Sequence, residues 1–284
     1  MIGSGSQTIN IKKTIFENSL ATLGSGDGGT VRSVGLGRCK LNIDQCIFRN
    51  NVSSRGAGVY WNANGSGALM NVKDTQFINN EASINGGALY TEGPCTFQGS
   101  NGTLSPVISS GSIPSSGLIG TIIQGNRATE RGGGICIAAY NDGSATAPTI
   151  FGENNITLGT NVIISGNSAP IGGGVSYNIG NSKVFGDNFI FNFNIQGAKI
   201  SGNTAENQGG GIFIEYDAFL YAAMSREQGK DLGLVPRVNV NSGEISGNIS
   251  QTGAGIFVAK GQCNITGGVV KNNASTSDGG AIHL

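Results

Sequence analysis

Short apolar runs alternate with polar turns along the whole chain, and one spacing of the two recurs. An apolar residue is followed three places later by Asn, and a Gly-rich cluster that leads into Ile, Val or Leu comes soon after, as in ISGNTAENQGGGIFI from Ile200 to Ile214. Such self-similarity is typical of a solenoid, in which each repeat buries its apolar face only against its neighbours. The clear copies are Phe48–Val59, Phe77–Leu89, Ile123–Ile135, Ile164–Val175, Ile200–Ile212, Ile245–Ile256 and Val270–Ile282, and a degenerate copy runs from Ile15 to Val31.

Apolar residues alternate within the runs, as at Cys39, Leu41 and Ile43, which directs one set of side chains inward as in a β-strand. The shortest coil, GIFVAKGQCNITGGVVKNNASTSDGGAI from Gly255, divides into three such runs separated by polar and Gly-rich turns. The sequence therefore predicts an all-β fold, a right-handed parallel β-helix of about seven or eight coils with three strands in each. We expect a single solenoid domain over residues 1–284.

The recurring Asn has a structural explanation in such a stack. Equivalent residues of neighbouring coils lie about 4.8 Å apart, so the side-chain amides, which carry both donors and an acceptor, can hydrogen-bond in a column. Asn also tolerates the left-handed backbone conformation of tight turns. We interpret the column as architecture and consider a ligand-binding role the weaker alternative. The predicted ladder residues are Asn51, Asn80, Asn126, Asn167, Asn203, Asn248 and Asn273.

The glycine clusters are predicted to be turns of the same coils. Glycine adopts positive φ without strain and leaves room for the neighbouring coil. The predicted turn residues are Gly86, Gly87, Gly132, Gly133, Gly172, Gly173, Gly209, Gly210, Gly253 and Gly279.

Unequal spacing of the ladder residues predicts insertions into the coils. Successive ladder Asn residues are 29, 46, 41, 36, 45 and 25 positions apart, so we expect inserted segments near 99–120, 180–196 and 216–236. The first is Ser- and Gly-rich and flexible in character, whereas the third has the composition of a short helix. Insertions in solenoids are common binding faces. Within 216–236, the predicted partner contacts are Phe219, Leu220, Tyr221 and Met224, although packing of these side chains on the rod is the competing interpretation.

Composition excludes several classes of protein. The 284 residues include 49 Gly without a collagen period, and 17 basic residues balance 17 acidic ones that are dispersed singly. Without a basic patch, neither nucleic acid nor a membrane surface is an expected partner, and no apolar run is long enough to insert into a membrane. The start, MIGSGSQTINIKK, lacks the apolar core of a secretion signal, and the sequence stops at GGAIHL inside a coil. We therefore expect a segment of a longer exported chain.

Residues suited to catalysis are sparse. Carboxylates are scattered except for Glu215 and Asp217, whose spacing would place both on one face of a strand, and the single His is His283. The five Cys contain no C-x-x-C pair. Three of them, Cys39, Cys95 and Cys263, are predicted to face the core, and a disulfide between Cys39 and Cys46 is left open. We expect no enzyme, no cofactor and no metal site.

Four short motifs carry a family resemblance. FRNN at Phe48 and FINN at Phe77, together with GGAL at Gly86 and GGAI at Gly279, resemble the repeats of the chlamydial polymorphic outer membrane proteins. In that family the repeats form an exported, surface-exposed passenger that acts in adhesion to host cells. The resemblance implies an extracellular or cell-surface location and an adhesive role.

The resulting hypothesis is a non-catalytic adhesin or structural scaffold of the cell surface, whose partner is a protein or glycan on another cell or in the matrix. One alternative is a subunit that self-associates into a filament or appendage through stacked coils. A second alternative is a polysaccharide lyase or glycoside hydrolase of the β-helix type, which rests on analogy of fold alone.

Overall fold

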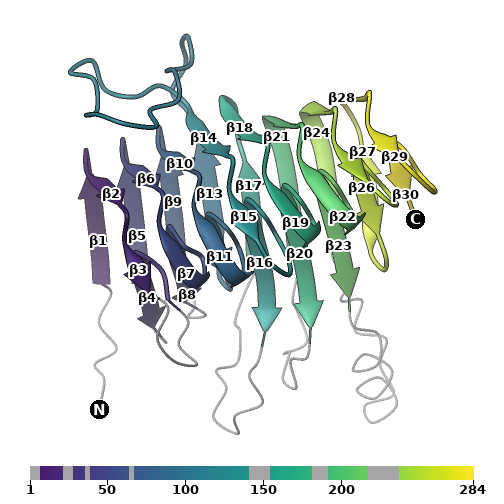
Figure 1. The fold of residues 1–284 in the computed structure, drawn as a ribbon, viewed down its shortest axis with the longest axis horizontal. Coiled ribbons are helices and arrows are strands. Elements are labelled where there is room, and N and C mark those ends of the chain that lie inside the picture. The colour runs from purple at the N-terminus through teal and green to yellow at the C-terminus, as the bar shows by residue number, and fades with distance from the viewer. Residues whose placement is uncertain are drawn as a thin grey trace, which may run out of the picture.

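A computed structural model describes residues 7–21, 28–35, 39–63, 67–140, 154–180, 191–216 and 237–284. Within these ranges every regular element is a β-strand and no helix is present. The strands wind into eight coils that follow one another along a single axis, from the purple N-terminal coil to the yellow C-terminal coil in Figure 1. The predicted parallel β-helix is confirmed. The helix suggested within 216–236 lies outside the described residues.

The coils build three sheets, in which every pairing between neighbouring coils is parallel. Sheet A has 14 strands in two series. The first series is β1 (Gln7–Lys12), β5 (Cys39–Asp44), β9 (Leu69–Lys73), β13 (Cys95–Gln98), β17 (Asn154–Leu158), β21 (Phe191–Ser201), β24 (Arg237–Ser246) and β27 (Gln262–Ile265). The second is β2 (Ile15–Glu17), β6 (Ile47–Arg49), β10 (Gln76–Ile78), β14 (Thr121–Gln124), β18 (Val162–Ser165) and β28 (Val269–Lys271). The long strands β21 and β24 pair with both series and join them.

Sheets B and C each take one strand from every coil. Sheet B consists of β3 (Leu20–Ala21), β7 (Val52–Arg55), β11 (Glu81–Asn85), β15 (Arg127–Ala128), β19 (Ser168–Ile171), β22 (Thr204–Gln208), β25 (Ile249–Ser250) and β29 (Ala274–Ser275). Sheet C consists of β4 (Val31–Gly35), β8 (Val59–Ala63), β12 (Leu89–Thr91), β16 (Ile135–Tyr140), β20 (Val175–Gly180), β23 (Ile212–Tyr216), β26 (Ile256–Val258) and β30 (Ile282–His283).

Six of the eight coils have four strands, and the coils of β21 and β24 have three, because each of these long strands spans both series of sheet A. The coils build three sheets, but the three runs predicted from the last coil omitted one segment. The additional segment is the strand of sheet B, which directly follows the ladder Asn. In the last coil this strand is only Ala274–Ser275. Two small residues carry no apolar alternation, so the hydrophobic pattern could not reveal the segment.

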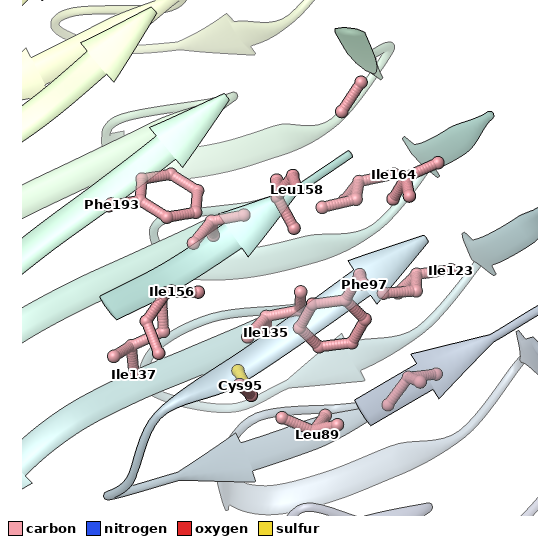
Figure 2. Packing of buried hydrophobic residues seen from close by; sticks show 14 of the residues in the cluster. Leu89, Cys95, Phe97, Ile123, Ile135, Ile137, Ile156, Leu158, Ile164 and Phe193 are labelled. Carbon is pink, nitrogen blue, oxygen red and sulfur yellow. The ribbon is translucent and has the colours of Figure 1, made fainter. Parts of the chain in front are cut away.

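The core is a set of columns because equivalent residues of successive coils are in register. Phe16, Phe48 and Phe77 occupy matching positions of β2, β6 and β10, and their rings stack at centroid distances of 4.7 and 4.8 Å. Figure 2 shows the continuation of this interior, where Phe97, Ile135 and Phe193 lie among aliphatic side chains from neighbouring coils. Full burial stabilises each large apolar side chain by about 1.5–3 kcal/mol. The stacking distance of the strands is thus also the packing distance of the core.

Most of the variation in coil length falls at the corner between a strand of sheet C and the next strand of sheet A. The connections 141–153, 181–190 and 217–236 occupy this corner, whereas the last coil crosses it with residues 259–261. The range 180–196 includes more than a connection, because β21 begins at Phe191 and buries Phe193 and Ile195 in the core. The segment 141–153 was not predicted, although the spacing between Asn126 and Asn167 indicated it.

The remaining long insertion, Gly99–Gly120, leaves sheet A between β13 and β14. It has no strands, but it is hydrogen-bonded to the rod at several points, for example from Asn161 Nδ2 to the Ser100 carbonyl oxygen at 2.6 Å. These contacts, which its Ser- and Gly-rich composition did not predict, place the insertion against the rod.

Left-handed backbone occurs at the residue before each ladder position and not at the ladder Asn itself. This residue is Asn in four coils and Gly in the other four, with φ between +52° and +68°. The motif thus reads apolar, any, Asn or Gly, Asn, and the left-handed conformation that we assigned to the ladder Asn belongs to its predecessor. The eight residues are Asn18, Asn50, Asn79, Gly125, Gly166, Gly202, Gly247 and Asn272.

Two left-handed glycines of one coil should differ in how well they tolerate replacement by Asn. Gly166→Asn should change the free energy of unfolding by less than about 0.5 kcal/mol, since Asn already adopts this backbone in four coils and no atom lies within 4 Å of the added Cβ. Gly172→Asn should cost at least ~2 kcal/mol, because its Cβ would lie 2.7 Å from the Val175 carbonyl oxygen. Chemical denaturation measures both values. Equal losses in the two variants would contradict the assignment.

Candidate functional site

The seven ladder residues form one column through the rod, at the corner between sheets A and B. From Asn80 to Asn273, the side-chain oxygen of each ladder Asn accepts two hydrogen bonds from the Asn of the preceding coil. Asn126, for example, donates to Asn167 Oδ1 from its backbone N–H at 2.9 Å and from Nδ2 at 2.9 Å. The same pattern joins Asn51 to Asn80 and continues to Asn273. The rungs from Asn51 to Asn248 are buried.

From Asn51 to Asn248, the second proton of Nδ2 also has an acceptor, so both protons of the side-chain amide are used. Asn167 Nδ2 donates to Asn203 Oδ1 at 2.9 Å and to the Ile123 carbonyl oxygen of the preceding coil at 2.9 Å. Asp cannot donate these bonds when ionised, and the shorter Ser side chain offers a single hydroxyl. In the first described coil Ser19 takes the ladder position, and its backbone N–H donates to Asn51 Oδ1 at 3.0 Å. The chemistry of the column explains Asn without a ligand.

The predicted turn glycines divide into two groups with different reasons for lacking a side chain. The first glycine of a cluster is left-handed, as at Gly132 with φ +68°. The second is not left-handed, but a Cβ on Gly133 would lie 2.4 Å from the Ser168 carbonyl oxygen of the next coil. The left-handed group is Gly86, Gly132, Gly172, Gly209, Gly253 and Gly279, and the close-approach group is Gly87, Gly133, Gly173 and Gly210.

A third glycine of the clusters covers the ladder, and sequence reasoning missed its role. An added Cβ on Gly174 would lie 3.0 Å from Asn203 Nδ2, and one on Gly211 would lie 3.0 Å from Asn248 Nδ2. Gly134 and Gly255 have the same relation to Asn167 and Asn273. The fixed spacing between Asn and the glycine cluster was the available signal, because it brings the cluster of one coil against the Asn of the next.

The four predicted partner contacts, Phe219, Leu220, Tyr221 and Met224, lie outside the described residues. What the fold fixes is where their segment joins the rod. Residues 217–236 connect the end of β23 at Tyr216 to the start of β24 at Arg237. The flanking strands belong to the same two sheets as those that flank 141–153 and 181–190, namely sheet C before each segment and sheet A after it.

The isolated acidic pair does not assemble into an acid/base centre within the described residues. Glu215 is paired with Arg131, at 2.8 Å between Oε2 and the guanidinium, and that guanidinium lies 5.5 Å from the centroid of the Phe213 ring. Asp217 lies outside the described residues. His283 stacks on Phe257 with centroids 4.9 Å apart. In the part of the chain that the structure describes, no three His, Cys, Asp or Glu are grouped to bind a metal.

All five cysteines are free thiols, and the open alternative of a Cys39–Cys46 disulfide is not realised. Cys39 and Cys95 lie in the core, and Cys263 packs against it. Burial raises the pKa of the Cys95 and Cys263 thiols, and it raises that of Cys136 to about 12. Because the thiolate is the reactive form, these side chains are poor nucleophiles at neutral pH.

A second amide column lies on the outer face of the first series of sheet A. Asn42 Nδ2 donates to Asn10 Oδ1 at 2.8 Å, and Asn71 Nδ2 donates to Asn42 Oδ1 at 2.9 Å. The same bonds join Asn239 to Asn194 and Asn264 to Asn239. These residues were not predicted. They make the same hydrogen bonds between side-chain amides as the buried ladder, but in a more exposed position. A substitution in this column is therefore a control for the same substitution in the ladder.

The described contacts define a parallel β-helix repeat protein whose recurrent residues hold the coils together. Residues 74–92 match the family model of the Chlamydia polymorphic membrane protein repeat. The matched segment contains β10, the ladder residue Asn80 and the GGAL turn from Gly86, so the predicted repeat class is confirmed there. No curated protein and no solved structure matches the chain. Among the described residues, no helix has the length and hydropathy needed to cross a membrane.

The ladder makes a direct stability prediction. Asn167→Ala removes the acceptor for two donors of Asn126 and leaves the Ile123 carbonyl oxygen and Asn203 Oδ1 short of donors. We expect a loss of about 3 kcal/mol in the free energy of unfolding, since an unpaired buried polar group costs about 1–3 kcal/mol. Asn239→Ala, in the outer column, should cost about 0.5 kcal/mol. Urea denaturation followed by circular dichroism compares the two, and similar losses would refute the ladder argument.

Proposed function

We propose that the chain is a non-catalytic β-helical scaffold displayed at a cell surface, where it acts as an adhesin. The observation that carries the proposal is that constant and variable residues occupy different parts of each coil. The recurrent Asn and Gly residues are used by the stack itself, whereas the length and composition of the chain vary mainly at one corner. A rod that holds variable segments along one edge is suited to display them to a partner.

The match to the membrane-protein repeat supports the surface location. The partner that fits an adhesin is a protein or glycan on another cell or in the matrix. Within the variable corner, segment 217–236 is the favoured contact, since it brings together Phe219, Leu220, Tyr221 and Met224. Aromatic and large apolar side chains contribute most of the free energy of binding in protein interfaces.

Replacement of residues 217–236 by the three-residue connection of the last coil, Ala259–Gly261, tests this assignment. Purified protein coupled to fluorescent beads should bind epithelial cells, and the replacement should reduce the bound fraction at least ten-fold without changing the β-sheet signal in circular dichroism. Replacement of residues 181–190 at the same corner is the matched control and should retain binding. Undiminished binding by the 217–236 replacement would exclude this segment, and absence of binding by the intact protein would count against adhesion.

End-to-end assembly is a second candidate, which the outermost coils favour. Core residues of these coils, including Phe16 and Ile11 at one end and Val270 and Ile282 at the other, are only partly buried. A further coil, whether from the same chain or from another copy, would cover them and continue the hydrogen bonding of the strands.

Light scattering over a concentration series, with electron microscopy of the same samples, tests this second candidate. Assembly through the ends predicts a molar mass that rises with concentration and rods of increasing length. Ile11→Lys combined with Val270→Lys should suppress both, because a charge would be buried at each junction. A constant monomeric mass of the unsubstituted protein would rule the candidate out.

A further inference from the structure

Lysines from three coils come together on the outer face of sheet A. Strands β1, β5 and β9 pair in parallel register, and Figure 1 shows them at the N-terminal end of the rod. Inward residues of these strands, such as Leu41 and Met70, are buried in the core, so the alternate residues point outward. The outward residues of the three strands, together with Lys13 at the end of β1, are hereafter the basic face. Its lysines are Lys12, Lys13, Lys40 and Lys73.

One carboxylate offsets part of this charge. Lys12, Asp44 and Lys73 follow one another in register, and Lys12 Nζ lies 3.5 Å from Asp44 Oδ2. An exposed pair of this kind contributes about 0–1 kcal/mol, and the Lys12 side chain remains 66% exposed. Asp74, the chain neighbour of Lys73, is buried and accepts hydrogen bonds from the insertion 99–120 instead. The basic face therefore carries four positive charges and one negative charge.

An amide column runs between the lysines. Its members Asn10, Asn42 and Asn71 form the middle row of the basic face, with Lys40 on one side and the row of Lys12 on the other. Asn42 Nδ2 donates to Asn10 Oδ1 at 2.8 Å, and Asn42 Oδ1 accepts from Asn71 Nδ2 at 2.9 Å. These bonds use one proton and one lone pair of the Asn42 amide, so the second proton and the second lone pair are available to a ligand.

The basic face is open to solvent. None of the nine outward residues of β1, β5 and β9 is buried, and Lys12, Lys40 and Lys73 are exposed. None of the nine is aromatic, and Leu69 is the only large apolar residue among them. Such a surface is suited to a ligand that carries hydroxyl groups and negative charges and makes no stacking contacts.

We propose that the basic face binds a linear anionic glycan, whose sulfate or carboxylate groups meet the lysines while its hydroxyl groups bond to the amides. Lysine is a compact point charge, and clusters of basic residues are typical of heparin-binding surfaces. Nucleic acid fits less well, because its bases stack on aromatic side chains, which this face lacks. The inference goes beyond the adhesin proposal, since it concerns a different part of the chain from segment 217–236 and requires no contact with a cell.

Surface plasmon resonance with immobilised heparin tests the class of ligand. The intact protein should bind saturably, and the affinity should fall as the salt concentration rises, because exposed charges are screened. Dextran, which has hydroxyl groups but no charge, should not bind. Binding to heparin and not to hyaluronan would assign sulfate as the recognised anion, whereas equal binding to both would assign the carboxylate. Failure to bind either glycan overturns the proposal, as does tighter binding of single-stranded DNA than of heparin at the same salt concentration.

Substitution of two lysines tests the assignment to this face. Lys40→Gln combined with Lys73→Gln should weaken heparin binding at least ten-fold. Lys199→Gln combined with Lys260→Gln removes the same charge from exposed positions in other coils and should change the affinity less than two-fold. Circular dichroism checks that both variants are folded. Equal losses in the two variants would show that net charge and not this face binds the glycan, and would overturn the proposal.

The contribution of the amides has a matched control in the same column. Asn42→Ala should weaken heparin binding at least three-fold, because it removes the donor and the acceptor between the lysines. Asn239→Ala, which lies in the same kind of column outside the basic face, should leave the affinity unchanged. Unchanged binding by Asn42→Ala would contradict recognition of glycan hydroxyl groups by the amides.

Discussion

Register between coils is the constraint on which the rest of this structure depends. Parallel strands of neighbouring coils are about 4.8 Å apart, so every side chain lies directly over its equivalent and must tolerate that equivalent at van der Waals distance. Like residues meet this condition in several ways: flat rings stack at Phe16, Phe48 and Phe77, and amides exchange hydrogen bonds along the Asn column. A residue out of register would lose its partners in two coils at once.

The same constraint explains why some glycines accept substitution within the chain and others do not. The left-handed glycine at the start of a cluster recurs from Gly86 to Gly279 in every coil. The next two positions admit Ala in some coils, as at Ala57 and Ala88. At the first position two requirements exclude a side chain: the left-handed backbone, and a carbonyl oxygen that would lie 2.7 Å from a Cβ at Gly172 and 2.4 Å from one at Gly132.

The features of the fold that could be predicted from the sequence are those that repeat in every coil. Residues whose role is identical in every coil, such as Asn167 and Gly172, were identified from spacing alone, because repetition displays the requirement several times. The short strands of sheet B were missed, since Ala274 and Ser275 have no pattern of their own. The insertion Gly99–Gly120 was predicted, but the residues that hold it against the rod were not. Asp74, Gln76 and Arg49 hydrogen-bond to residues of this insertion that lie 26 to 62 positions away in sequence, and no repeat displays these contacts.

Some outward-facing residues depart from the usual pattern because they are aromatic or apolar and yet buried. Tyr60 and Tyr90 point away from the core of sheet C, yet they are buried, stacked at 5.2 Å and overlaid by the guanidinium groups of Arg32 and Arg55. The guanidinium cation over each ring face helps to cover an aromatic side chain that points away from the core, and it interacts favourably with the ring. Ile47, Ile78 and Ile122 of sheet A are chain neighbours of core residues and are also buried, and the insertion Gly99–Gly120 is hydrogen-bonded to the same strands β6 and β10. Repetition fixes the residues of the interior, so the coils differ mainly in the residues that face outward. Where an outward residue is apolar and buried, another side chain or chain segment covers it.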